Sequence, residues 1–236
     1  MSGYGQFCPV AKATELVGEK WTLLILRELL LGTKRFSDFQ RALSRLSPTL
    51  LAKRLRHLEE FGIIIRKKVS GHRGHEYHLT VAGKELEPLI ELLAIWGMRW
   101  ARSQLSEDEL DVEFLMMELQ RRLQTGHLPD GETVICIIFG ELAVHKTWWL
   151  VAQGEAVDLC TEDPGKDVDL YINSSVRTIV EVWEGDLEIR TALRQGSIKA
   201  HGSRHLVKTM PDWFGVCLYK EIKRAEPELI HRVVRE

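Results

Sequence analysis

Residues 35–83 place two short helical patterns directly before a basic β-hairpin pattern. The first pattern covers 37–43, residues 44–46 form a turn, and the second pattern covers 47–61 before Gly62 closes it. Ser47 is a strong helix N-cap, and Pro48 suits the first helical position because its missing N–H costs nothing there. A helix, a turn, a second helix and a hairpin in this order typically present the second helix to the major groove of DNA. DNA binding is therefore the leading expectation for this part of the chain.

The second of these helices divides into two faces when its residues are placed at about 100° intervals. Leu50, Leu51, Leu55 and Leu58 fall on one face, and Pro48, Thr49, Ala52, Lys53 and Arg56 fall on the other. Small side chains on the second face let the backbone approach the floor of the groove, and the longer cations reach base edges or phosphates. The expected DNA contacts are Arg35, Ser47, Thr49, Ala52, Lys53 and Arg56, joined by His72 and Arg73 from the hairpin tip.

Arg54 projects onto the apolar side of the same helix. A charge is buried only when it has a partner, so we interpret Arg54 as half of an internal ion pair with Glu59 or Asp38, not as a DNA contact. The same region also fits a small helical core with an ordinary solvated hairpin. The agreement of helix, turn, helix and hairpin signals in order and spacing favours DNA binding over that alternative.

A long helix is expected over 81–102, and it carries a stripe of large apolar residues. The stripe consists of Leu86, Leu89, Leu93, Trp96 and Trp100. A small domain cannot cover such a stripe alone, whereas a partner helix from a second subunit would. We therefore expect a homodimer, which suits a palindromic operator in double-stranded DNA.

The charge is divided unevenly along the 236 residues, although the net charge is only -2. Residues 1–105 hold 17 Lys and Arg against 10 Asp and Glu, and the remainder holds 15 against 24. A basic front half suits a polyanion, and an acidic back half would be repelled by it. The four cysteines lack C-x-x-C spacing, and no apolar run approaches the length of a membrane span, so we expect a cytoplasmic protein in a reducing compartment.

Residues 7–102 resemble the HxlR family of bacterial winged helix-turn-helix transcription regulators. The resemblance rests on Cys8-Pro9-Val10, Val17-Gly18-Glu19-Lys20-Trp21-Thr22, Arg35-Phe36-Ser37-Asp38-Phe39, Leu51 through Arg54-Leu55 to Leu58-Glu59, and Tyr77-His78-Leu79-Thr80 before Gly83. It implies homodimers on inverted repeats, with terminal helices at the dimer contact. Pro48 and Thr49 stand where many relatives have longer polar or basic residues, so the resemblance does not give the operator sequence.

Cys8 matches the position of a redox or electrophile sensor in several members of that family. It also precedes a helix begun by Pro9, where the helix dipole and free N–H groups stabilise a thiolate, and Lys12 follows one turn later. The alternative is a partly buried structural thiol. A redox-sensing regulator acting through Cys8 is therefore an alternative to ligand control.

The back half predicts an α+β fold with an antiparallel sheet covered by helices. Strands are expected at 134–139, 146–151, 156–160, 168–172 and 197–201, and helices near 110–117, 176–183, 187–193 and 206–213. The charged stretch 103–111 is the best boundary, which gives domains of 1–104 and 105–236.

Residues 134–214 resemble the sterol-carrier-protein type of lipid-binding domain. The resemblance rests on Asp167-Val168-Asp169-Leu170-Tyr171-Ile172, Trp183-Glu184-Gly185, Ala192-Leu193-Arg194-Gln195-Gly196 and Ser197-Ile198-Lys199-Ala200-His201-Gly202. It implies a tunnel between sheet and helices for a small hydrophobic ligand, fatty acyl or sterol-like. The candidate pocket residues are Ile137, Phe139, Trp149, Leu170, Ile179, Trp183 and Met210, which also fit a plain core.

Sequence motifs of known catalytic chemistry are missing from the chain. There is no P-loop, no G-x-G-x-x-G after a strand, no G-x-S-x-G and no H-E-x-x-H. We therefore expect no enzymatic activity, no cofactor and no metal, since His72, His75 and His78 on a hairpin are more simply solvated. The leading interpretation is a dimeric DNA-binding regulator controlled by a small apolar ligand. The alternative from another class is a lipid carrier whose winged helix only dimerises.

Overall fold

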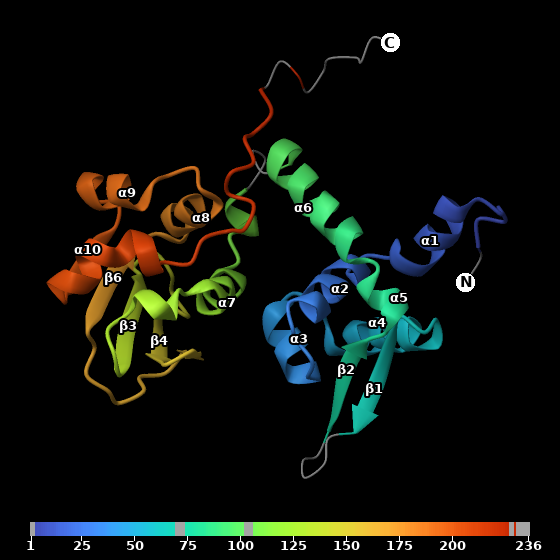
Figure 1. Cartoon of the computed structure of the whole chain (residues 1–236), viewed down its shortest axis with the longest axis horizontal. Coiled ribbons are helices and arrows are strands. Elements are labelled where there is room, and N and C mark those ends of the chain that lie inside the picture. The colour runs from blue at the N-terminus through green and yellow to red at the C-terminus, as the bar shows by residue number, and fades with distance from the viewer. Residues whose placement is uncertain (1–2, 69–73, 102–105, 227–228, 230–236) are drawn as a thin grey trace. The chain divides into compact units, whose positions relative to one another are not determined.

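The computed structural model of the chain describes residues 3–68, 74–101, 106–226 and 229 (Figure 1). The chain forms two compact units, residues 1–95 and residues 96–236. The domain boundary expected between 104 and 105 stays a prediction. The two units are described separately below.

The N-terminal unit consists of helices followed by a two-stranded hairpin and further helix. Its elements are α1 (Pro9–Val17), α2 (Thr22–Leu30), α3 (Phe36–Ala42), α4 (Pro48–Glu60), β1 (Ile64–Lys68), β2 (His75–Leu79), α5 (Val81–Lys84) and the start of α6 (Glu87–Trp100). Strands β1 and β2 pair antiparallel, from Ile64 opposite Leu79 to Lys68 opposite His75. The expected order of helix, turn, helix and hairpin is confirmed.

The core of this unit joins α2, α3, α4 and the start of the hairpin. Its most deeply buried side chains are Ile25, Leu26, Phe39, Leu51, Leu55, Leu58 and Ile64. Burial of one such side chain contributes about 1.5–3 kcal/mol. The apolar face expected for the helix after Ser47 is thus the face that α4 buries, and this fixes which face remains for a partner.

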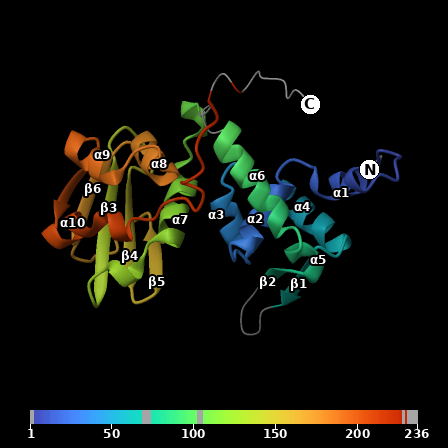
Figure 2. The same cartoon turned by 45° about the horizontal axis from the view of Figure 1, so that its top comes forward.

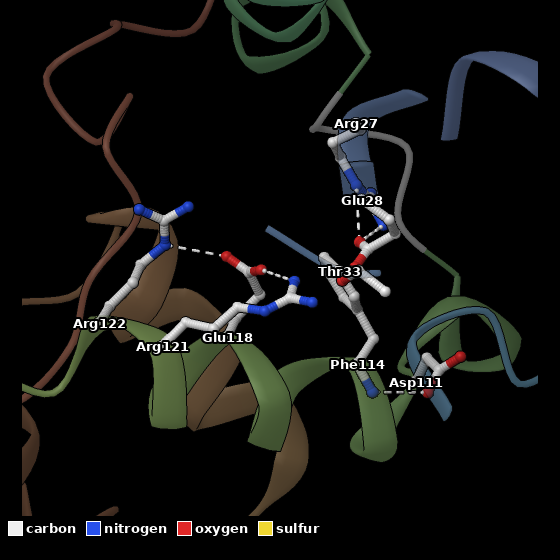
Figure 3. A network of polar contacts seen from close by, with 8 residues as sticks. All are labelled: Arg27, Glu28, Thr33, Asp111, Phe114, Glu118, Arg121 and Arg122. Atoms are coloured by element: carbon white, nitrogen blue, oxygen red, sulfur yellow. Dashed lines mark hydrogen bonds and ion pairs between the residues drawn. The ribbon is translucent and has the colours of Figure 1, made fainter. Parts of the chain in front are cut away.

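A buried carboxylate lies at the end of α2. Glu28 is fully buried, and its Oε1 accepts from Arg27 Nη2 at 2.8 Å while its Oε2 accepts from the Thr33 hydroxyl at 3.0 Å (Figure 3). Both oxygens therefore have donors, as a buried charge requires. This cluster stabilises the turn between α2 and α3.

Thr80 and Gly83 fasten the hairpin to the helices that follow it. The Thr80 hydroxyl donates to the Gly62 carbonyl at 2.7 Å and accepts from Gly83 N at 3.2 Å. A Cβ at Gly83 would lie 2.2 Å from the Ile63 carbonyl oxygen, so only glycine allows this close approach. The β1–β2 hairpin is therefore held in a fixed direction at its base.

The single long helix expected over 81–102 is wrong, because the structure divides it into α5 and α6. Pro88 explains the break. Proline has no backbone N–H to donate to the carbonyl four residues earlier, and its ring clashes with that carbonyl. The residue four positions before Pro88 is Lys84, where α5 ends. Pro88 is tolerated one residue inside α6 because the first turn of a helix has no intrahelical N–H partners.

The C-terminal unit is a five-stranded sheet with helices. Its elements are the rest of α6, the 3-10 helices η2 (Glu107–Glu109) and η3 (Thr125–His127), α7 (Val112–Arg122), β3 (Glu132–Phe139), β4 (Thr147–Gln153), β5 (Ala156–Cys160), β6 (Leu170–Ser174), α8 (Val176–Glu184), α9 (Ile189–Gln195), β7 (Lys199–Gly202) and α10 (Arg204–Trp213). The mixed α+β class is confirmed, and each expected strand overlaps one of β3 to β7.

The sheet is mixed, so the expectation of an antiparallel sheet is wrong at one of its four pairings. The strand order is β5-β4-β3-β6-β7, and β3 pairs parallel with β6 while the other three pairs are antiparallel. Strands β3, β4 and β5 form a meander, which leaves the far edge of β3 open. Residues 161–169 carry the chain back to that edge, and β6 then runs in the same direction as β3 (Figure 2). Such a crossover is what a parallel pair requires.

One face of this sheet forms the core of the C-terminal unit. The cluster contains Ile135, Ile137 and Phe139 of β3 and side chains from α7, α8 and α10. Neighbouring residues of a strand point to opposite faces. Trp148 pairs with Ile137 and belongs to the cluster, so Trp149, which pairs with Cys136, lies on the opposite face. The prediction that Trp149 lines the same pocket as Ile137 is therefore wrong.

A buried carboxylate also organises α7. Glu118 is 2% exposed, and it accepts from Arg121 Nη1 at 3.0 Å and from Arg122 Nε at 2.8 Å (Figure 3). Asp111 caps the same helix by accepting from Phe114 N at 3.0 Å. These contacts are structural, since each stabilises the helix that carries it.

None of the helices in the described ranges is long and apolar enough to cross a membrane.

Candidate nucleic-acid interface

The exposed face of α4 begins at its N-terminal cap. Ser47 has an extended backbone and its hydroxyl accepts from Leu50 N at 3.3 Å, and Pro48 occupies the first helical position. Thr49, Lys53 and Arg56 are exposed and Ala52 is half-buried. Because Thr49, Lys53 and Arg56 are spaced by four and three residues, they lie on one face of the helix. The residues expected to contact DNA on this helix therefore share one accessible face.

Lys53 and Arg56 have no ion pair within the described part of the chain. A cation without an internal partner is available to a phosphate or a base edge at no cost of breaking a salt bridge. Ala52, one turn before Arg56 at the edge of the same face, carries only a methyl side chain. This arrangement suits the close approach of a helix to an anionic groove.

Arg35 sits beside the hairpin. It is the N-cap of α3, its backbone bridges to Glu76, and its Nε lies 3.6 Å from Glu76 Oε1. The neighbouring Lys34 carbonyl accepts from Tyr77 N at 2.9 Å, which extends the pairing along β2. Glu76 also lies 3.3 Å from His78 Nε2. Glu76 thus partly neutralises Arg35, a role that sequence reasoning missed because it depends on the bridge between the segment before α3 and strand β2.

The hairpin adds cations on its first strand. Arg66, Lys67 and Lys68 are exposed, and Arg66 Nε lies 3.8 Å from Glu59 Oε1 of α4. The expected contacts His72 and Arg73 lie outside the described residues. The described base of the hairpin therefore contributes a basic strand next to α4.

Arg54 is buried, with 9% exposure, and anchors α4 to the turn before α2. Its guanidinium forms an ion pair with Glu19, and its Nε donates to the Lys20 carbonyl at 3.1 Å. The interpretation of an internal ion pair is confirmed, but the expected partners Glu59 and Asp38 are wrong. The true partner lies in the segment between α1 and α2, where the backbone of Trp21 takes a left-handed conformation with φ 81°.

Cys8 is exposed and forms the N-cap of α1. Its carbonyl accepts from Lys12 N at 3.0 Å, while the Lys12 ammonium pairs with Glu15 at 3.0 Å. The lysine that the sequence placed near the thiol therefore has a carboxylate partner.

Within the described residues no three His, Cys, Asp or Glu side chains lie close enough together to hold a metal ion.

The candidate pocket residues of the C-terminal unit lie in its packed interior, apart from Trp149. Ile137, Phe139, Leu170, Ile179 and Met210 are each at most 1% exposed and belong to one cluster, and Trp183 packs against it. These side chains form the core. Their contact with a ligand stays a prediction.

The HxlR-like helix-turn-helix family profile matches residues 16–105. Over 89 residues the chain is 48% identical to Rv3095 of Mycobacterium tuberculosis (strain ATCC 25618 / H37Rv), an uncharacterized HTH-type transcriptional regulator, and this covers 37% of the chain and 56% of the relative. The chain thus spans just over half the length of this mycobacterial relative.

For two other similar proteins, the match covers a larger share of their own length. The solved structure of the redox regulator HypR in its reduced form is 32% identical with a TM-score of 0.37, covering 38% of this chain and 90% of HypR. The uncharacterized HTH-type transcriptional regulator YvaP of Bacillus subtilis (strain 168) is 35% identical over 97 residues, covering 40% of this chain and 90% of YvaP. Because this last match takes in nine-tenths of a whole regulator, the chain belongs to the HxlR-like helix-turn-helix family of transcriptional regulators.

Proposed function

We propose that the chain regulates transcription by binding double-stranded DNA as a homodimer, with α4 in the major groove. The observation that carries this proposal is the division of α4 into a buried leucine face and an exposed face where Lys53 and Arg56 have no ion pair within the described residues. Thr49 and Ala52 supply short side chains on the same face. Base contacts from this face specify sequence, while phosphate contacts position the helix.

The proposed dimer uses α6. This helix exposes large apolar side chains, with Leu92 64%, Leu93 44% and Trp96 59% exposed. A second copy of α6 removes this surface from water, and two-fold symmetry then places two copies of α4 on an inverted-repeat operator.

The C-terminal unit is the proposed effector domain of the sterol-carrier type, with a small hydrophobic fatty acyl or sterol-like ligand. One feature of the described interior supports a ligand there. Trp183 Nε1 is buried without a hydrogen-bond partner, and an unsatisfied buried donor costs about 1–3 kcal/mol. A ligand oxygen would satisfy this donor after repacking of the apolar cluster around it. A ligand acts as a switch only if it prefers one dimer geometry.

The test measures binding of the full chain to its own upstream DNA as a function of salt. Wild type should show a steep salt dependence, and Lys53→Ala and Arg56→Ala should each weaken binding and reduce the slope of log K against log salt by about 1. Lys208→Ala is the matched control, because Lys208 is an exposed cation on α10 of the other unit. Binding that is weak, independent of salt and unchanged in the α4 variants would contradict the regulator and favour a lipid carrier.

A redox-sensing regulator is the second candidate, and the exposure of Cys8 at the start of α1 favours it. Oxidant should then change DNA affinity, and Cys8→Ser should abolish that change while leaving any lipid response intact. An oxidant response that survives in Cys8→Ser would rule this candidate out.

A further inference from the structure

Three charged side chains lie in one row across the base of the hairpin. Arg35 pairs with Glu76 of β2 through an antiparallel bridge, and Lys67 of β1 is opposite Glu76 on the other side. Residues directly opposite each other in neighbouring strands share a face, so the three side chains follow one another in the order Arg35, Glu76, Lys67. One carboxylate is therefore placed between two cations.

This row lies on the outer face of the hairpin. Tyr77 follows Glu76 and packs its ring edge-on against Phe39 of α3, with centroids 6.2 Å apart. Neighbouring residues of a strand point to opposite faces, so Glu76 points away from α3. The Arg35 side chain is 57% exposed, the Glu76 side chain is 24% exposed, and Lys67 is exposed as well. The cations of the row are thus accessible to a large anion.

The backbone brings Arg35 and Glu76 close together. The Lys34 carbonyl accepts from Tyr77 N at 2.9 Å. The hydrogen bond is therefore made by the flanking residues, and Arg35 and Glu76 form a non-hydrogen-bonded pair, in which side chains approach most closely. Arg35 Nε lies 3.6 Å from Glu76 Oε1, and Glu76 Oε2 lies 3.3 Å from His78 Nε2. The carboxylate therefore has one neighbour at each of its oxygens.

The contact with Glu76 engages only part of the Arg35 guanidinium. An arginine carries five N–H donors, and four of them are on its two terminal nitrogens. Because the ion pair is made through Nε, the terminal nitrogens remain for a second anion. Their fixed fork matches two oxygens of a phosphate. A long side chain loses conformational entropy when it is ordered on binding, and a carboxylate that already restrains it reduces that loss.

We propose that Glu76 is a positioning residue for DNA binding, which orients Arg35 toward a backbone phosphate. Arg35 binds the phosphate through its two terminal nitrogens while Nε stays with Glu76, and Lys67 adds a second cation on the same face. Phosphate contacts of this kind fix the register of a protein on the duplex. The effect on DNA rests on the proposed function, whereas the restraint of Arg35 by Glu76 does not.

The sign of one substitution separates this role from simple repulsion. Glu76→Gln removes a negative charge, and an acid that only repelled DNA would give tighter binding once neutralised. At about 8 Å from a phosphate and about 0.1 M salt, that gain is less than about twofold. If Glu76 orients Arg35, the variant should instead bind the upstream DNA about three- to tenfold more weakly, which is the cost of ordering one long side chain.

Glu60→Gln is the matched control for this substitution. Glu60 is an exposed acid at the end of α4, outside the row, so its variant should bind DNA as tightly as wild type or slightly more tightly. Undiminished binding by Glu76→Gln would contradict the proposal.

Two arginine variants identify the side chain through which Glu76 acts. Arg35→Ala should weaken binding and lower the slope of log K against log salt by about 1. In that background Glu76→Gln should cause no further loss, because no guanidinium is left to orient. Arg35→Lys keeps the charge but not the forked donors, so it should weaken binding about as much as Glu76→Gln does. Additive losses from Arg35→Ala and Glu76→Gln would refute the positioning role.

A measurement without DNA keeps this result separate from the proposed function. In the full chain labelled with nitrogen-15, the Arg35 Nε–H group should have restricted motion in wild type and in Glu60→Gln, and it should become mobile in Glu76→Gln. The Tyr77 amide should keep its protection from hydrogen exchange in Glu76→Gln, since its bond to the Lys34 carbonyl is a backbone contact. Equal mobility of Arg35 in wild type and Glu76→Gln, or loss of Tyr77 protection, would overturn the proposal. If wild type binds DNA under no condition, the proposed function fails, and the Arg35 signal still decides whether Glu76 restrains this side chain.

Discussion

Arg54→Ala should lower the free energy of unfolding of the N-terminal unit more than any single substitution on the exposed face of α4 does. The variant removes the ion pair with Glu19 and the hydrogen bond from Nε to the Lys20 carbonyl. A hydrogen bond to a charged group contributes about 1.5–3 kcal/mol, and breaking a fully buried ion pair costs about 3–5 kcal/mol. The Glu19 side chain is 28% exposed, so water recovers part of its hydration after the change. We therefore expect a loss of about 2–4 kcal/mol in the free energy of unfolding.

The assay is urea unfolding of the full chain. Hydrogen exchange at the amides of α2 and α4 monitors the unfolding, so that the N-terminal unit is observed by itself. Arg56→Ala is the matched control, because Arg56 is an exposed arginine on the same helix and its loss should cost no more than about 0.5 kcal/mol. A double-mutant cycle with Glu19→Gln should give a coupling of about 1 kcal/mol or more. Equal costs for the two arginine variants, or a coupling near zero, would refute the anchoring role of Arg54.

Trp96→Glu should convert the proposed dimer to a monomer in light scattering, because it puts a charge on the exposed apolar face of α6; a dimer that persists would place the contact elsewhere. Burial, aided by the charge of Asp163, raises the pKa of the Cys136 thiol to about 11, so the unfolded chain loses this proton at lower pH than the folded chain and stability falls between about pH 9 and 11. Cys136→Val should flatten that fall in a series of urea titrations, and iodoacetamide at pH 8 should modify Cys8 and spare Cys136. Leu170→Ala should cost about 2–5 kcal/mol in unfolding of the C-terminal unit, since Leu170 is fully buried; a cost below about 1 kcal/mol would contradict tight packing there.

Local signals in the sequence were sufficient to predict α4 and its buried face. The Ser47 cap, the proline after it and the leucine period are all set within one helix, and these short-range preferences agree with the packing that the structure has. The break between α5 and α6 was also readable, since Pro88 lies in the middle of the expected helix. The apolar stripe through 86–100 by itself favours one continuous helix, and it continues on α6 after the break.

Contacts between distant segments were not readable in the same way. Glu59 on the same helix and Asp38 on the helix before it were the expected partners of Arg54, but the chain folds Glu19 of the α1–α2 turn against it instead. The parallel pairing of β3 with β6 likewise depends on where residues 161–169 return the chain. Strand periodicity gives the two faces of a strand, but it does not say which face meets the helices, and so it did not separate Trp149 from Ile137.

The three faces of α4 follow from a single helical period, and they predict how different substitutions affect DNA binding. Leu51, Leu55 and Leu58 hold the helix in the core, Arg54 and His57 are also buried, and Lys53 and Arg56 remain exposed. A helix moves largely as one piece, so loosening Arg54 should shift the proposed base and phosphate contacts together, whereas Lys53→Ala removes one proposed contact from an otherwise unmoved helix. Arg54→Ala should therefore weaken binding to the operator more than to unrelated DNA, because only base contacts need exact placement. Lys53→Ala should weaken both about equally if it contacts phosphate. Equal losses on both DNAs for Arg54→Ala would mean that α4 keeps its position without this anchor.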